Sequence, residues 1–168
     1  AGGAARVAAV LCDMNWRLAP AELEDCIRLT SALLLFTSAR HAPALEGLQP
    51  GNLRVVGFGA EYEALLDAAA ATPPPPVAEP EDGYLILYTS GTTGAPKAAL
   101  ISHRAELARF ALSQIDADLK PGDAFVAWAP MFHMVSLEHL LHVLALGGTG
   151  YVVDGATFRQ IDFIATGI

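Results

Sequence analysis

Short apolar runs alternate with longer mixed segments along most of the chain. The apolar runs predict strands over residues 6–12, 33–36, 53–58, 84–88, 124–128 and 151–153. The segments between them predict helices that begin at residue 20 or span residues 41–48, 61–71, 104–115, 137–146 and 157–166. Because strands and helices alternate, we expect an α/β fold in which neighbouring strands are mostly parallel.

Residues that start or stop helices support several of these elements. Pro20 suits the first turn of a helix, and acidic residues follow it near the positive end of the helix dipole. Ser102 is a suitable N-cap for the helix over 104–115. Residues 120–123 predict a turn, and the helix over 137–146 is ended by Gly147 and Gly148.

Four consecutive prolines at 73–76 interrupt the alternation. Such a run excludes helix and favours an extended polyproline segment. We therefore divide the chain into a first α/β part over 1–72, a connector over 73–83 and a second part over 84–168. The connector is most simply a spacer, and a docking motif for a partner module is the alternative.

Composition excludes several classes of protein. Hydrophobic residues make up 53% of the 168 residues and charged residues 17%, so most of the chain has enough apolar side chains to fold. Ten Lys and Arg stand against eighteen Asp and Glu without a basic cluster, so we expect no nucleic-acid partner. No apolar run reaches the roughly 18 residues of a membrane span, so we expect no integral membrane segment.

The cysteines and histidines give no pattern typical of a metal site. No Cys or His lies at ligand spacing beside Cys12 or Cys26. We expect both to be buried free thiols, which fits a reducing compartment and a cytoplasmic location. His139 and His142 are three residues apart on a predicted helix, but the sequence offers no third ligand, so we expect helix-face histidines.

The segment over residues 88–97, Tyr-Thr-Ser-Gly-Thr-Thr-Gly-Ala-Pro-Lys, follows a predicted buried strand. It places four hydroxyls and two glycines within six residues: Thr89, Ser90, Gly91, Thr92, Thr93 and Gly94. Glycines let backbone N–H groups approach a phosphate, hydroxyls add donors, and Lys97 adds positive charge. The spacing differs from that of the P-loop, because Gly91 and Gly94 are three apart. The segment predicts a polyphosphate site, and a hydroxyl-rich loop without a ligand is the alternative.

The same ten residues resemble the signature loop of the acyl-adenylate-forming superfamily, which contains acyl-CoA synthetases, luciferases and peptide-synthetase adenylation domains. Residues 15–23 are similar to an upstream segment of its acyl-CoA ligases, 130–133 to its next core motif and 147–149 to the following turn. The family's later motifs, an aromatic-Gly-x-Thr-Glu and a Thr-Gly-Asp, are not in the sequence. The resemblance therefore implies an incomplete piece of the family's large N-terminal domain.

The resemblance also implies roles for individual residues. Residues 89–94 would wrap the β- and γ-phosphates of ATP, with Lys97 beside them as a catalytic cation and the Thr92 hydroxyl on Mg²⁺. Phe132 and His133 would line the pocket for a carboxylic acid, with His133 also beside the reacting atoms. In the implied reaction the carboxylate attacks the α-phosphorus of ATP, pyrophosphate leaves, and coenzyme A takes the acyl group.

On this resemblance we expect a parent acyl-CoA ligase, and we expect the 168 residues to be inactive without the remainder of that enzyme. Residues 16–18 and 131–133 favour a fatty or aryl acid as the substrate. Ala98 departs from the family's usual glycine, and we interpret it as tolerated. Two alternatives stay open: a fragment of an amino-acid adenylation domain, and a non-catalytic truncated module. A truncated sheet would expose apolar edges and self-associate.

Overall fold

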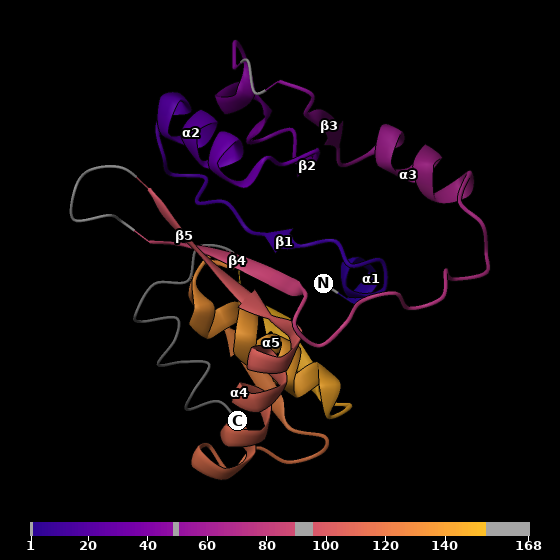
Figure 1. Cartoon of the computed structure of the whole chain (residues 1–168), viewed down its shortest axis with the longest axis vertical. Coiled ribbons are helices and arrows are strands. Elements are labelled where there is room, and N and C mark those ends of the chain that lie inside the picture. The colour runs from indigo at the N-terminus through magenta and orange to yellow at the C-terminus, as the bar shows by residue number, and fades with distance from the viewer. Residues whose placement is uncertain (1, 49–50, 90–95, 154–168) are drawn as a thin grey trace.

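The computed structural model describes residues 2–48, 51–89 and 96–153, which form a mixed α/β arrangement around three small sheets (Figure 1). The elements in chain order are α1 (Gly2–Arg6), β1 (Leu11–Cys12), α2 (Pro20–Thr30), β2 (Leu34–Thr37), the 3-10 helix η1 (Ala42–Leu45), β3 (Arg54–Gly57), α3 (Ala60–Asp67), β4 (Gly83–Thr89), β5 (Lys97–Ser102), α4 (His103–Asp116), β6 (Ala124–Ala127), α5 (Met134–Ala145) and β7 (Thr149–Val152). Three of the four strand pairs in the described part are parallel. The predicted α/β class is confirmed.

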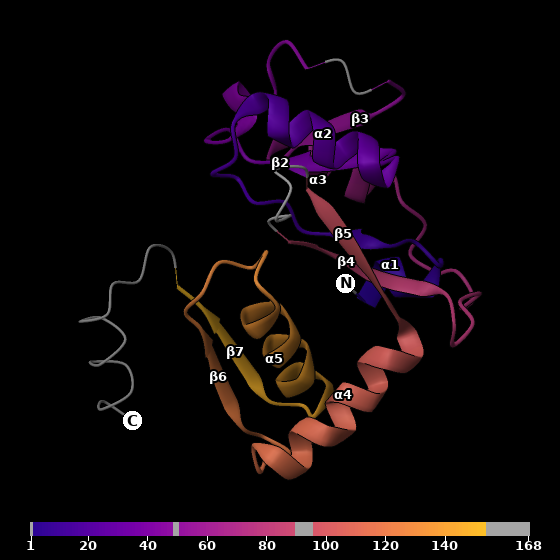
Figure 2. The same cartoon turned by 60° about the vertical axis from the view of Figure 1, so that its left-hand side comes forward.

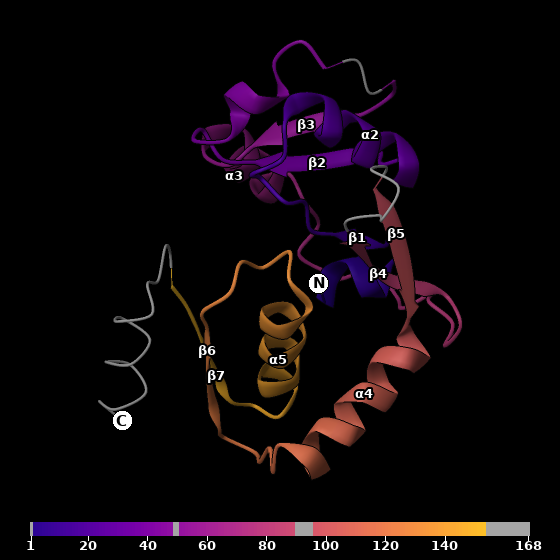
Figure 3. The ribbon, with the colours of Figure 1, turned by 90° about the vertical axis from the view of Figure 1, so that its left-hand side faces the viewer.

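In the first part of the chain, α2 lies alongside the parallel pair β2-β3 (Figures 2 and 3). The helix buries Leu23, Cys26 and Ile27, which the helical repeat places on one face. Its first turn is closed by Glu22, whose carboxylate accepts a hydrogen bond from the Ala19 N–H at 2.8 Å. The acidic residues after Pro20 therefore start the helix as the sequence predicted.

Two predictions for this part were wrong. Strand structure within residues 6–12 is limited to β1, because α1 extends to Arg6 and Ala8 adopts a left-handed conformation with φ of 53° that interrupts the extended backbone. The helix predicted over 41–48 is only the short η1, since Gly47 adopts a left-handed conformation with φ of 79°. Residues 73–82 contain neither helix nor strand, and their Pro74 carbonyl accepts a hydrogen bond from Arg6 Nε at 3.0 Å.

Strands β4 and β5 form an antiparallel hairpin, with β1 parallel to β4 on its other side. The series of predicted strands did not include β5. This pair is the antiparallel exception in a described part whose strand pairs are mostly parallel, as expected, and its reason is the short return from Thr89 to Lys97. A parallel neighbour would need a crossover of a dozen or more residues.

Helix α5 connects the parallel strands β6 and β7 and packs against both (Figure 2). The α5–β7 turn needs glycine at Gly148, because a Cβ there would lie 2.1 Å from the Asp123 carbonyl oxygen. α5 begins at Met134, three residues before the predicted start at 137. Ser102 caps α4 as predicted, its Oγ accepting from the Ala105 N–H at 3.2 Å. The helix predicted over 157–166 lies outside the described residues.

The apolar core of the described residues is small. Its buried members are Leu23, Cys26, Ile27, Val56, Leu85, Ala127, Leu137 and Val143. Larger apolar side chains remain in solvent, such as Leu33 (73% exposed) and Ile115 (77% exposed). Exposed apolar surface of this kind is typical of faces that another segment or molecule covers. None of the described helices is long and apolar enough to cross a membrane.

Candidate functional site

The loop end of the β4-β5 hairpin carries Thr89 and Lys97, the residues of the predicted phosphate site that lie in the described part of the chain. Thr89 is the last residue of β4 and lies opposite Lys97, the first residue of β5. Both are exposed. The sequence predicted a loop from Thr89 to Lys97, and the antiparallel register brings these two ends together. The other predicted loop residues, Ser90, Gly91, Thr92, Thr93 and Gly94, lie outside the described residues.

Tyr88, one residue before this end, is tied to the first part of the chain through its hydroxyl. The hydroxyl donates to the Cys26 carbonyl at 2.9 Å and accepts from Cys12 Sγ at 3.1 Å. It also lies 3.3 Å from the hydroxyl oxygen of Thr30, at the end of α2. Sequence reasoning missed this contact, although a tyrosine that ends an apolar strand offers a hydroxyl able to seek a buried partner.

Both cysteines are free thiols, as predicted, but the prediction that both are buried holds for Cys26 alone. Cys26 is fully buried, whereas Cys12 is half-buried. Burial raises the pKa of Cys26 to about 11, and burial is also the main reason that the pKa of Cys12 is raised. Burial therefore favours the protonated form of both thiols, which is a weaker nucleophile than the thiolate.

Phe132 and His133, predicted to line the acid pocket, lie together in the turn before α5. Their ring centroids are 4.7 Å apart, with Phe132 half-buried and His133 exposed. His133 is the N-cap residue of α5, and its N–H donates to the Pro130 carbonyl at 2.9 Å. The fully buried Ser136 closes the same turn by accepting from the Ala129 N–H at 3.0 Å.

The structure therefore divides the predicted site residues between two places. Thr89 and Lys97 belong to the sheet β1-β4-β5, whereas Phe132 and His133 follow β6 and belong to the β6-α5-β7 unit. Each pair is assembled by local structure, a hairpin in one case and a helix N-terminus in the other.

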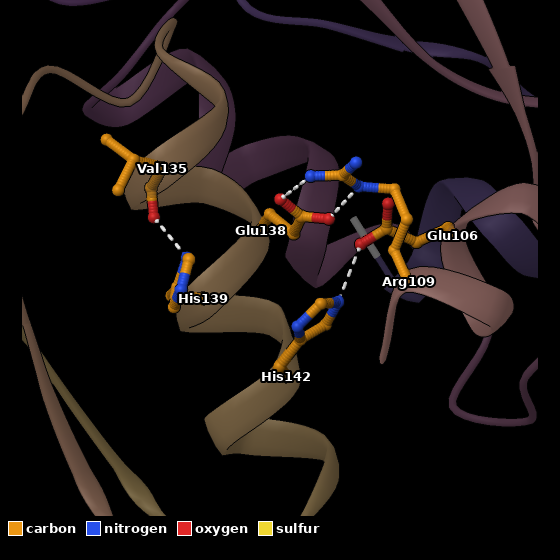
Figure 4. A network of polar contacts seen from close by, with 6 residues as sticks. All are labelled: Glu106, Arg109, Val135, Glu138, His139 and His142. Carbon is orange, nitrogen blue, oxygen red and sulfur yellow. Dashed lines mark hydrogen bonds and ion pairs between the residues drawn. The ribbon is translucent and has the colours of Figure 1, made fainter. Parts of the chain in front are cut away.

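A second group of polar residues joins α4 to α5 (Figure 4). Arg109 forms two hydrogen bonds to the Glu138 carboxylate, one of them 2.7 Å from Nη2 to Oε2. His142 Nε2 lies 3.2 Å from Glu106 Oε1. His139 turns away from this group and its Nδ1 lies 2.9 Å from the Val135 carbonyl. The sequence did not predict this contact, since its residues are scattered over two helices.

Burial governs the charges of this α4-α5 network. It raises the pKa of Glu106, with a further contribution from the nearby Glu138 carboxylate, and it lowers the pKa of His142. Single ligand atoms of Glu106, Glu138 and His142 lie within 4.8 Å of one another, a spacing that a metal ion could use. Because Arg109 already supplies a cation to Glu138, we interpret the network as an internal ion-pair contact.

Known proteins similar to this chain include several CoA ligases. Indoleacetate–CoA ligase of Aromatoleum aromaticum is 34% identical over 145 residues, covering 80% of this chain and 28% of that protein. A 3-hydroxybenzoate–CoA/4-hydroxybenzoate–CoA ligase of Thauera aromatica is 33% identical over 165 residues, covering 91% of this chain and 32% of that protein. The chain spans about a third of the length of these relatives.

The comparison with solved structures supports the same relationship. A solved structure of a Mycobacterium tuberculosis fatty acyl CoA synthetase superposes with a TM-score of 0.79 at 26% identity, covering 92% of this chain and 31% of that one. The model of the family described as AMP-binding enzyme matches residues 1–168. The chain belongs to this family of AMP-binding enzymes, and the resemblance drawn from its sequence motifs is confirmed.

Proposed function

We propose that this chain supplies the triphosphate-binding hairpin and one wall of the acid pocket of an ATP-dependent acyl-CoA ligase. The observation that carries the proposal is the pairing of Thr89 with Lys97, which brackets a segment rich in hydroxyls and glycines. Family membership and the CoA ligase relatives support it.

In this proposal the hairpin end binds the leaving part of ATP. The β- and γ-phosphates are contacted by Thr89, by the hydroxyls and backbone N–H groups of residues 90–94 and by the Lys97 ammonium. Because Lys97 is exposed, its charge is available to a ligand. When bound, Mg²⁺ would take the Thr92 hydroxyl beside phosphate oxygens, which are the hard donors it prefers, and would neutralise phosphate charge.

Phe132 and His133 contact the carboxylic acid in the same proposal. The half-buried Phe132 ring gives an apolar wall, and the exposed His133 imidazole offers a polar group beside the carboxylate. The carboxylate oxygen attacks the α-phosphorus, pyrophosphate leaves, and the thiol of coenzyme A then displaces AMP from the acyl-adenylate. Catalysis rests mainly on positioning and on stabilising the developing negative charge.

We propose an aryl or fatty acid as the substrate class. The names of the relatives support it, since two act on aromatic acids and the structural neighbour is a fatty acyl synthetase. The free cysteines fit the reducing cytoplasm, where ATP and coenzyme A are available. Since the relatives are about three times as long, we propose that activity needs the parts of the enzyme outside these 168 residues.

The test is exchange of radiolabelled pyrophosphate into ATP by the complete native polypeptide that contains these residues. The panel contains indoleacetate, 3-hydroxybenzoate, a long-chain fatty acid and a neutral amino acid. We expect exchange that depends on an aryl or fatty acid, and thioester when coenzyme A is added. Exchange with the amino acid alone would favour an adenylation domain, and no exchange with any acid would contradict the proposal.

A further inference from the structure

We propose that Tyr88 is a positioning residue for the ATP-binding end of the hairpin. In this inference its hydroxyl, held by the C-terminal part of α2, fixes the place where Thr89 and Lys97 meet. The inference rests on the proposed function, in which those two residues contact the phosphates of ATP.

The position of Tyr88 in the hairpin is the first argument. It precedes Thr89 directly and pairs with Ala98, so it belongs to the last but one pair of the β4-β5 ladder. A contact at Tyr88 therefore acts directly beside the Thr89–Lys97 pair, without occupying the ligand-binding end itself.

The partners of the hydroxyl are the second argument. Cys26 and Thr30 come from α2 and Cys12 from β1, at separations of 62, 58 and 76 residues from Tyr88. Thr30 Oγ1 also donates to the Cys26 carbonyl at 3.0 Å, so the group is interconnected. One hydroxyl thereby joins the hairpin to two elements that fold in the first part of the chain.

The acceptor of the Tyr88 hydroxyl belongs to a buried residue. Cys26 is fully buried, so its carbonyl is fixed within α2 and shielded from water. Burial and the Cys12 hydrogen bond raise the pKa of Tyr88, and the phenol therefore stays protonated and able to donate at neutral pH.

The experiment compares Tyr88→Phe with Tyr84→Phe in the complete native polypeptide. Tyr84 lies near the other end of β4, and its ring centroid is 4.9 Å from that of His103 with the two rings tilted. Tyr84→Phe therefore removes a hydroxyl from the same strand at a position away from Thr89 and Lys97. For Tyr88→Phe we expect the KM for ATP in pyrophosphate exchange to rise about fivefold, the size expected for loss of one buried hydrogen bond that orients a site.

Further readouts separate positioning from a general loss of structure. The KM for the acid is expected to stay within about twofold of the wild type. The rate of thioester formation from preformed acyl-adenylate is expected to do the same, because neither quantity depends on the triphosphate end of the hairpin. Thr30→Val is the second variant, and it is expected to raise the KM for ATP less. Combined with Tyr88→Phe it is expected to add little, since both act through one contact.

Each outcome decides the inference. A Tyr88→Phe enzyme with an unchanged KM for ATP, or with equal losses in both half-reactions, would overturn the inference. The proposed function would still stand in that case, provided that the wild type shows acid-dependent exchange. Equal effects of Tyr84→Phe and Tyr88→Phe would overturn the inference as well. Absence of acid-dependent exchange in the wild type would remove the proposed function, and the inference with it.

Discussion

The hairpin end and the α4-α5 network both gather charged or polar groups, but they do so in opposite ways. The hairpin end presents Thr89 and Lys97 to solvent, and its chemistry lies in one contiguous segment of sequence. The network brings together residues from two helices and buries Glu106 and Glu138. An exposed cation at a strand end is available to a phosphate, whereas a carboxylate buried against arginine is neutralised within the protein.

This difference separates binding from stability. Substituting Lys97 is expected to lower the rate of the proposed reaction and to leave the fold intact, because Lys97 is exposed. Substituting a member of the network is expected to change the free energy of unfolding, because a buried carboxylate would lose its partner. The following variants test that separation, beginning with the largest expected effect on stability.

Arg109→Leu removes the cation that pairs with Glu138, whose side chain is 4% exposed. We expect the free energy of unfolding to fall by about 2–4 kcal/mol, somewhat less than for a fully buried pair because Arg109 itself is half exposed. Urea unfolding measures the change. The matched control is Arg104→Leu on the same helix, whose partner Glu81 is 69% exposed. We expect that control to change stability by under about 1 kcal/mol, and similar losses in both variants would contradict the account.

Ser102→Ala changes the junction of β5 and α4, which lies between the hairpin end and the α4-α5 network. It removes the oxygen that accepts from the Ala105 N–H, and we expect a loss of about 1 kcal/mol, typical of an N-cap. Thermal unfolding measures it against Ser113→Ala in the body of the same helix. An equal or larger effect of the Ser113 variant would show that the cap does not hold this junction.

Glu106→Gln tests the buried network through pH. Because the folded-state pKa of Glu106 is raised above its ordinary 4.5, the folded protein binds the proton more tightly than the unfolded chain. Wild-type stability therefore falls as pH rises from below 4.5 through the raised folded-state pKa. Gln cannot ionise, so the melting temperature of the variant is expected to gain on the wild type between pH 4 and pH 7. A difference that does not change with pH would contradict the assigned burial.

Much of the fold followed from local pattern. Pro20, Ser102 and the residues around Gly148 mark element boundaries by backbone chemistry that any fold must respect, and α2, α4 and the α5–β7 turn begin or end accordingly. The failures have equally local causes. The Ala-rich residues up to Arg6 form a helix where the predicted strand was to begin, and residues 98–102, most of β5, were assigned to no predicted element.

The candidate site was predictable only where its residues are contiguous. The segment proposed to bind phosphate could be found because its glycines, hydroxyls and lysine lie together within residues 89–97. The hydrogen bond between Tyr88 and Cys26 could not be predicted, since the two residues are 62 apart in the sequence. They meet only once α2 lies beside the end of β4. The Arg109–Glu138 contact was hidden for the same reason, as two helices must pack before the pair exists.

The most direct test of the central claim is the rate of each half-reaction in Lys97→Ala, measured in the complete native polypeptide. Lys120→Ala is the control, as Lys120 is the other lysine in the sequence and pairs with Asp118 at 2.6 Å. We predict that acyl-adenylate formation slows by about 100-fold, while thioester formation from preformed acyl-adenylate stays within about twofold of the wild type. Equal losses in both half-reactions, or no loss in either, would contradict a triphosphate-binding role for the hairpin.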